Sequence, residues 1–220
     1  MRAVRARPAF VLAGLGASVA TACLVAAELA GGDPMMVLEV LGAVALGVWA
    51  FVGAGNVLRG RRLARALDAH GVCSVVAGVE CRILRGGRRR AFVLGAVRPA
   101  IYIGEELLAT LDPEELRAVL LHEDHHRRTL APLRSAALEA WLSLVGGWAP
   151  ARGRLVERLT HLEEEADAAA LRRGVSPGTL ASALLKSDVS LIGAGAAFSA
   201  ASDRRLRNLL DAAAGQAAAR

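Results

Sequence analysis

Hydrophobic residues dominate two long runs near the N-terminus, whereas the rest of the chain alternates between short apolar and polar stretches. Residues 9–27 carry no charged side chain, and residues 35–58 carry one acid, Glu39. A helix as long as the first run rises about 28 Å, close to the roughly 30 Å hydrocarbon core of a bilayer. The pattern therefore predicts a transmembrane hairpin over residues 1–60, with spans at about 9–29 and 35–58.

Arginines flank both runs and indicate how the hairpin is oriented. They precede the first run and follow the second: Arg2, Arg5, Arg7, Arg59, Arg61, Arg62 and Arg65. Because the cytoplasmic flanks of membrane spans carry an excess of Lys and Arg, both ends are expected inside the cell. We therefore predict a multi-pass protein of the cell membrane whose domain at residues 61–220 is cytoplasmic. A cleaved signal peptide is the alternative, but the first run is long for one and a second run follows closely.

Short runs rich in β-branched residues, separated by Gly or Pro, occupy residues 72–103. Such runs are typical of a small β-sheet. Within them, the stretch RILRGGRRRAFVL predicts a hairpin that turns at or near Gly86 and Gly87. An edge strand of this sheet could pair with an extended polypeptide substrate.

A well-capped helix is predicted over residues 113–128. Asp112 suits the N-cap position, Pro113 the first helical position, and Glu115 completes a capping box. Apolar residues then recur at helical spacing and mark the face that packs on the core.

Two more helices are expected after it, at about 134–149 and 152–173. The uncharged core of the first is about ten residues, short of the roughly 20 that a span needs. Trp141 and Trp148 suit an interfacial position, so both an interfacial and a membrane helix remain open. Together these elements predict an α+β fold that is mainly helical.

Composition supports a lipid partner and argues against nucleic acid. The chain is 54% hydrophobic, with a mean hydropathy of +0.39, above the roughly 45–50% apolar content of soluble domains. A net charge of +6 would suit nucleic acid, but the arginines flank apolar segments and only 4% of residues are aromatic. Because basic and aromatic residues do not interleave, no nucleic-acid partner is expected.

The cysteines do not suggest a disulfide framework or a zinc ribbon. There are three, Cys23, Cys73 and Cys81, and they form no CxxC pair. Pairing of Cys73 with Cys81 across a hairpin remains open, but buried free thiols are favoured.

The chemistry is concentrated in an HExxH pattern within the well-capped helix. His122 and His126 lie one helical turn apart, so both imidazoles can reach one zinc ion. Glu123 is rotated by about 100° around the helix and addresses a metal-bound water instead. Zinc lowers the pKa of such a water from about 15.7 towards 7, and Glu123 would take its proton. The pattern predicts a zinc cofactor and metal-assisted hydrolysis.

A catalytic zinc usually has three protein ligands, and a later acidic cluster offers the third. Glu163 and Asp167 are four residues apart and share a helix face. Glu163 is expected to bind the metal, and Asp167 to orient a ligating histidine. His161 is an alternative third ligand or an oxyanion donor, and His125 could support the site without binding metal.

The sequence resembles a known family at these motifs. VLLHEDHH followed by EEEAD is similar to the membrane-embedded zinc metallopeptidases of the gluzincin type. The closest resemblance is to the BlaR/MecR-type antirepressor peptidases, and next to the HtpX and CAAX-protease branch. It covers roughly residues 35–212, including the lead-in FVLGAVRPAIYIG, and implies a zincin-like helical catalytic domain.

The resemblance also implies roles for individual residues. By position, His122, His126 and Glu163 match the zinc ligands, Glu123 the general base and Asp167 the orienting carboxylate. The strand along which substrate would lie corresponds to Phe92, Val93, Leu94 and Gly95. One departure is Ala131, which stands where relatives often have an aspartate.

We therefore predict a membrane-bound zinc endopeptidase that hydrolyses peptide bonds of a protein or peptide at or near the bilayer, as in regulated proteolysis. A repressor-type or membrane-protein partner would fit this role. The alternative is a catalytically silent regulatory or scaffolding protein that retains the metal site. The intact HExxH pattern favours the enzyme.

Overall fold

A computed structural model describes residues 34–87, 89–145, 148–187 and 196–218, together with Val25, Glu28 and Gly31. The first predicted span, 9–29, lies outside these residues except for Val25 and Glu28, which are helical. The chain divides into two compact units, Met1–Gly55 and Asn56–Arg220. The sequence-based boundary was placed a few residues later, at 60/61.

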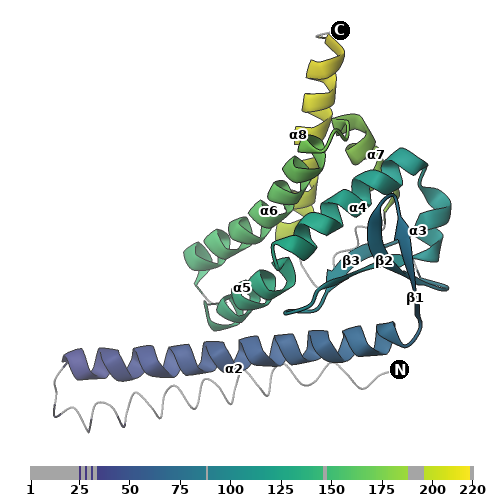
Figure 1. The fold of residues 1–220 in the computed structure, drawn as a ribbon. Helices are drawn as coiled ribbons and strands as arrows, with labels where there is room; N and C mark the ends of the chain where they lie inside the picture. The colour runs from purple at the N-terminus through teal and green to yellow at the C-terminus, as the bar shows by residue number, and fades with distance from the viewer. Residues whose placement is uncertain are drawn as a thin grey trace. The chain divides into compact units, whose positions relative to one another are not determined.

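The longest element is the apolar helix α2, Pro34–Asp68 (Figure 1). It is long and apolar enough to cross a membrane, and none of the residues in its apolar window is buried within the described chain. The helix continues past the predicted end of the span at residue 58, through the arginines, to Asp68. Arg, Ala and Leu are strong helix formers, and a single Gly60 in this stretch does not break the helix.

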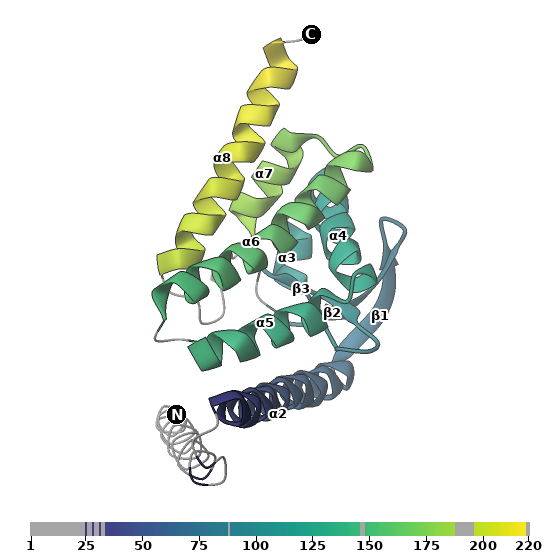
Figure 2. The ribbon, with the colours of Figure 1, turned by 90° about the vertical axis from the view of Figure 1, so that its left-hand side faces the viewer.

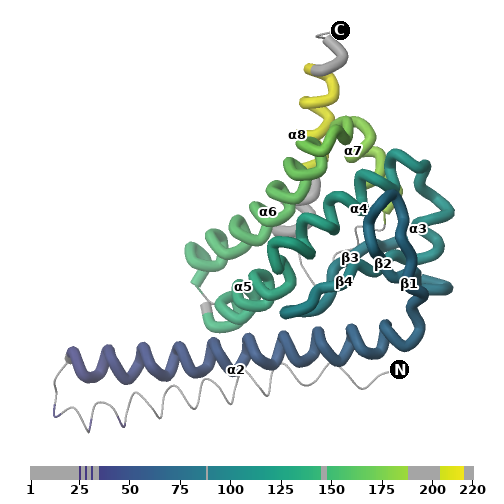
Figure 3. The backbone as a smooth tube through the Cα atoms, in the orientation of Figure 1, coloured from purple at the N-terminus to yellow at the C-terminus, as the bar shows by residue number. Residues whose placement is uncertain are grey.

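The four strands form one small sheet, as the sequence predicts (Figure 3). The strands are β1 (Gly71–Val76), β2 (Val79–Leu84), β3 (Ala91–Leu94) and β4 (Ala100–Gly104). Their spatial order is β1-β2-β4-β3, with β2 parallel to β4 and the other two pairs antiparallel. β3 is therefore an edge strand.

The predicted hairpin across Gly86 and Gly87 is wrong. The chain does turn there, but β4 lies between β2 and β3, so those two strands do not pair. The physical reason is burial: four of the five β4 residues are buried, whereas every β3 residue is only half-buried. The most apolar strand takes the central position, and β3 is left at the edge.

Cys73 and Cys81 are both free. In the antiparallel pairing of β1 with β2, Cys73 opposes Arg82 and Ser74 opposes Cys81, so the two thiols face opposite sides of the hairpin. Cys81 is buried as predicted, but Cys73 is exposed, which corrects the expectation for that residue.

Helices make up most of the remainder, which confirms a mainly helical α+β fold (Figures 1 and 2). They are α3 (Glu105–Thr110), α4 (Pro113–Arg128), α5 (Ala131–Val145), α6 (Ala149–Arg172), α7 (Pro177–Lys186) and α8 (Ala196–Ala218). The helices predicted at 134–149 and 152–173 start three residues earlier than expected. The turn before α5 places Leu130 at φ 52°, a conformation that ends α4 sharply.

Helix α4 is the centre of the second unit and contacts the sheet, α5, α6 and α7. Its predicted capping box is present: the Asp112 carboxylate accepts from the amides of Glu114 and Glu115, and the Glu115 carboxylate accepts from the Asp112 amide. Glu115 also accepts hydrogen bonds from Ser182 and Lys186 of α7. The start of α4 is therefore bonded to α7, and the following turns of α4 pack against α6.

Candidate metal centre

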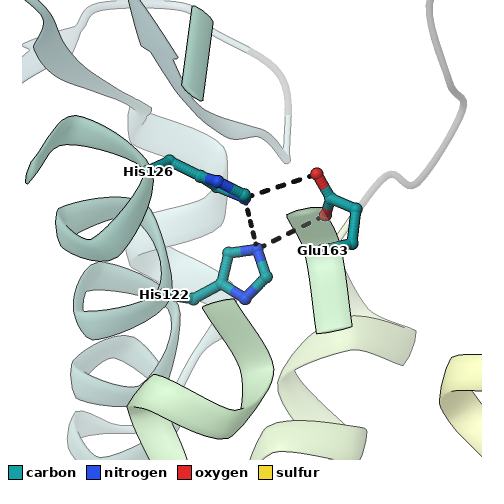
Figure 4. Close-up of side chains that lie close together, drawn as sticks. All are labelled: His122, His126 and Glu163. Atoms are coloured by element: carbon teal, nitrogen blue, oxygen red, sulfur yellow. Dashed lines mark hydrogen bonds and ion pairs between the residues drawn. The ribbon is translucent and has the colours of Figure 1, made fainter. Parts of the chain in front are cut away.

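Two histidines of α4 and one glutamate of α6 meet in a nearly buried cluster. Figure 4 shows both imidazole rings directed at the Glu163 carboxylate. The side chains of His122 and His126 are only 10% and 11% exposed. The cluster forms because α4 packs against α6 and the i, i+4 spacing places both rings on the contact face.

The separations within the cluster fit a tetrahedral metal ion. The two Nε2 atoms of His122 and His126 are 3.1 Å apart. Glu163 Oε2 lies 3.5 Å from His122 Nε2, and Glu163 Oε1 lies 3.3 Å from His126 Nε2. Donors at about 2.0–2.1 Å from a tetrahedral zinc lie about 3.3–3.4 Å from one another. The three residues therefore form a possible metal-binding triad of the type N, N, O.

Asp167 fixes the orientation of the first histidine. His122 Nδ1 lies 2.9 Å from Asp167 Oδ1 and donates to it, so the lone pair of Nε2 is directed at the centre of the triad. Burial lowers the pKa of His122, but the hydrogen bonds to Asp167 and Glu163 outweigh it and raise that pKa to about 10. The metal-free ring therefore carries a proton on Nε2 as well as on Nδ1, and a bound metal ion would replace the proton on Nε2.

Arg205 of α8 completes the centre, and the sequence did not single it out. Its guanidinium donates to both carboxylate oxygens of Asp167 and to Glu163 Oε2, each at 2.9 Å. Although burial alone would raise the pKa of Glu163, the hydrogen bonds from the two histidines hold it well below its usual range. Arg205 thus balances the charge of the buried Asp167 and of the half-buried Glu163, and it contacts Glu163 through Oε2, which leaves Oε1 available to a metal.

Arg205 differs from its neighbouring arginines only in its burial within the folded chain. Arg205 and Leu209 are four residues apart and both buried, whereas Arg204 and Arg207 are exposed. An arginine on the apolar face of a helix needs a buried acid as its partner. In the basic stretch SDRRLRNLL, this one arginine cannot be recognised without knowing which face packs inward.

Glu123 lies beside the triad at the wall of a cavity of about 460 Å³. His126 and Glu163 line the same cavity. Burial raises the pKa of Glu123, and the neighbouring histidines partly oppose this. From this position the carboxylate can exchange a proton with a group bound in the cavity.

The strand residues Phe92, Val93, Leu94 and Gly95 line this cavity as well. Phe92 stacks on Tyr102 with ring centroids 5.5 Å apart, which fixes the middle of β3. Gly95 ends the strand at φ 109°, where a Cβ atom would lie 2.8 Å from the Arg98 carbonyl oxygen. The edge strand and the metal triad thus border one space.

Three residues near the motif lie apart from the triad. His125 and His161 line a different cavity, of about 410 Å³, and the His161 side chain is 62% exposed. Asp124 is buried and forms ion pairs with Arg127, Arg128 and Arg173, so it anchors the end of α4 to the end of α6. The described geometry places Glu163, and not His161, at the third position.

Ala131, where the resemblance led us to expect an aspartate, is buried and lines the cavity of the triad. A small apolar residue therefore widens the cavity at this point and adds no charge to it.

No family model, curated protein or solved structure matched the chain in comparisons with known proteins.

Proposed function

We propose that the protein is a membrane-bound zinc endopeptidase with a zincin-like catalytic domain. The observation that carries the proposal is the triad of His122, His126 and Glu163 at the wall of a cavity that Glu123 also lines. A zinc ion held by this triad would lower the pKa of a bound water towards about 7 and polarise the scissile carbonyl.

The chain's own residues then account for the remaining steps. Asp167 accepts a hydrogen bond from His122 Nδ1–H and so keeps Nε2 available as a ligand. The Glu123 carboxylate accepts a proton from the attacking water and passes it to the leaving amide nitrogen. Overall, the peptide C–N bond breaks and a C–O bond forms between the carbonyl carbon and the water oxygen. The proton that water loses is transferred to the nitrogen of the new amino terminus.

Substrate binding is proposed to use the edge of the sheet. Within the described part of the chain β3 pairs with β4 alone, so we propose that its other edge accepts an extended polypeptide. The cavity beside it supports catalysis over the catalytically silent alternative, because a silent scaffold has no need of space next to Glu123.

The membrane part of the proposal rests on α2 and on charge. One long apolar helix near the N-terminus passes the length and hydropathy requirements for a span. We infer a hairpin with residues 9–29 as the other span, a cytoplasmic catalytic domain, and a protein substrate at or near the bilayer.

The test compares the full-length protein with Glu123→Gln, in detergent and in cells. Both should bind one zinc per chain, but only the wild type should generate new protein N-termini in the membrane proteome. Glu164→Gln on the same helix as Glu163 serves as the matched control and should behave as wild type. Zinc binding with identical proteomes would support the silent regulator, and absence of stoichiometric zinc would contradict both.

A further inference from the structure

The cavity beside the metal centre is acidic in a basic protein. The chain has 27 Lys and Arg residues against 21 Asp and Glu. Among the described residues, no Lys or Arg lines the cavity, yet three carboxylates do: Glu123, Glu139 and Glu163. A cavity lined by one sign of charge concentrates groups of the opposite sign.

Two of these carboxylates belong to the metal centre. Glu163 lies between the histidines and Arg205, and Glu123 stands beside the histidines. Glu139 of α5 is different, because its exposed carboxylate forms no ion pair with any residue in the described part of the chain. Arg59 acts on it electrostatically, but the Arg59 guanidinium is hydrogen-bonded to Asn56.

Glu139 lies where a polypeptide bound along the cavity face of α5 would pass. Ala131, Ser135 and Glu139 are spaced by four residues, so they lie along one face of α5 and all line the cavity. Glu139 is eight residues beyond Ala131, a rise of about 12 Å along the helix. An extended chain covers this distance in about three or four residues.

The remaining lining is largely apolar. Apart from the three carboxylates and His126, it consists mostly of apolar residues of β3 and α5, with Asn56 and Ser135 as its uncharged polar members. Such a surface accepts the uncharged part of an extended segment without selecting its sequence. Glu139 is therefore the group in the cavity most suited to discriminate between substrates by charge.

We propose that Glu139 is a specificity-determining residue that selects extended polypeptide segments carrying Lys or Arg where the bound segment passes the Glu139 end of α5. The inference rests on the proposed peptidase function and names its substrate class. A cationic side chain would pair with Glu139 where the cavity walls exclude part of the solvent, which strengthens the interaction.

Peptide binding to the zinc-loaded, full-length Glu123→Gln protein in detergent tests this without requiring turnover. The probes are extended fluorescent peptides with small apolar residues, in which Lys, Leu or Glu occupies each position in turn. At one position, Lys should bind on the order of tenfold tighter than Leu. Adding Glu139→Gln should remove that preference, and Glu139→Lys should transfer it to the Glu peptide.

Two controls define what would overturn the inference. Glu157→Gln removes an exposed carboxylate of α6 that does not line the cavity, so the Lys preference should persist. An undiminished preference in Glu139→Gln, or the absence of any preference in the parent, would contradict the inference. A preference that emerges only after Arg59→Gln would show that Glu139 serves as a partner of Arg59 instead.

Failure of the proposed function gives a distinct result. If Lys peptides bind through Glu139 but wild-type protein cleaves none of them in a Glu123-dependent manner, the peptidase proposal fails and the charge selection stands. If wild-type protein cleaves peptides with equal kcat/KM for Lys and Leu at every position, the peptidase stands and the charge selection fails.

Discussion

At the scale of single residues, Asp167 determines how well His122 can serve as a ligand. Asp167→Asn keeps the shape but weakens the acceptor for His122 Nδ1, which lies 2.9 Å away. Losing such a supporting carboxylate typically lowers metal affinity about 10–100-fold. We expect this loss for zinc, measured by competition with a chromophoric chelator. Glu164→Gln should leave the affinity unchanged, and equal affinities of Asp167→Asn and wild type would contradict the assigned role.

His122 also predicts a pH dependence of the metal-free protein. Its pKa in the folded state is raised from 6.5 to about 10, so the protonated form is stabilised by folding. This stabilisation is complete below about pH 6.5 and is lost as the pH rises through 10. We expect the thermal midpoint of metal-free wild type to fall over this range more than that of Asp167→Asn. Parallel curves for the two proteins would exclude the assigned protonation, and bound zinc should abolish the difference.

Among the elements, α8 contacts the candidate metal site through Arg205. Arg205 is 7% exposed, and its removal leaves Asp167 and Glu163 without their cation. Breaking a buried ion pair from one side costs about 3–5 kcal/mol. We expect Arg205→Ala to lower the free energy of unfolding by about that amount, measured by denaturant titration in detergent, and to speed amide exchange in α6 and α8.

Arg207 provides the matched control for Arg205 on the same helix. It is exposed and two residues further along α8, so Arg207→Ala should change the stability by no more than about 0.5 kcal/mol. Arg205→Lys keeps the charge but not the bidentate geometry. Its loss of unfolding free energy should lie between those of Arg205→Ala and Arg207→Ala. Equal effects of Arg205→Ala and Arg207→Ala would mean that α8 is held by apolar packing alone.

Elements whose bounds are set by a few neighbouring residues could be predicted from the sequence. Features that depend on which of several elements is buried most could not. The capping residues Asp112 and Glu115 define the start of α4 by themselves, and that helix was predicted at its observed bounds. The neighbours of β3 depend on which strand is buried most, a property of the whole sheet. The hairpin signal at Gly86 and Gly87 describes only the turn, so it could not reveal that β4 lies between β2 and β3.

The same distinction applies to the site. His122 and His126 could be predicted to share a helix face because their spacing alone decides it. That Glu163 joins them depends on how α4 packs against α6, and only the motif suggested it. Arg205 and Glu139 carry no motif, since their importance comes from a buried face of α8 and from a cavity that α5 lines.

At the scale of the whole molecule, α2 links the apolar N-terminal region to the candidate site. About 20 residues suffice to cross a bilayer, and α2 has 35. Its later residues Asn56, Val57 and Gly60 line the cavity, and Asn56 donates to the Ala136 carbonyl of α5. The part of α2 that belongs to the second compact unit therefore contributes to the cavity wall.

Cys73 provides a natural reporter of the proposed orientation. It is exposed, whereas Cys81 is buried and its thiol has a pKa raised by that burial, so Cys81 should react little. In a Cys23→Ser background, a membrane-impermeant maleimide should label Cys73 in permeabilised cells and not in intact ones. The protein should also remain in the membrane fraction after alkaline extraction, and Cys73→Ser should abolish the labelling. Equal labelling of intact and permeabilised cells would place the candidate metal site outside the cell, because β1 and this site belong to the same compact unit. The proposed substrate would then be outside as well.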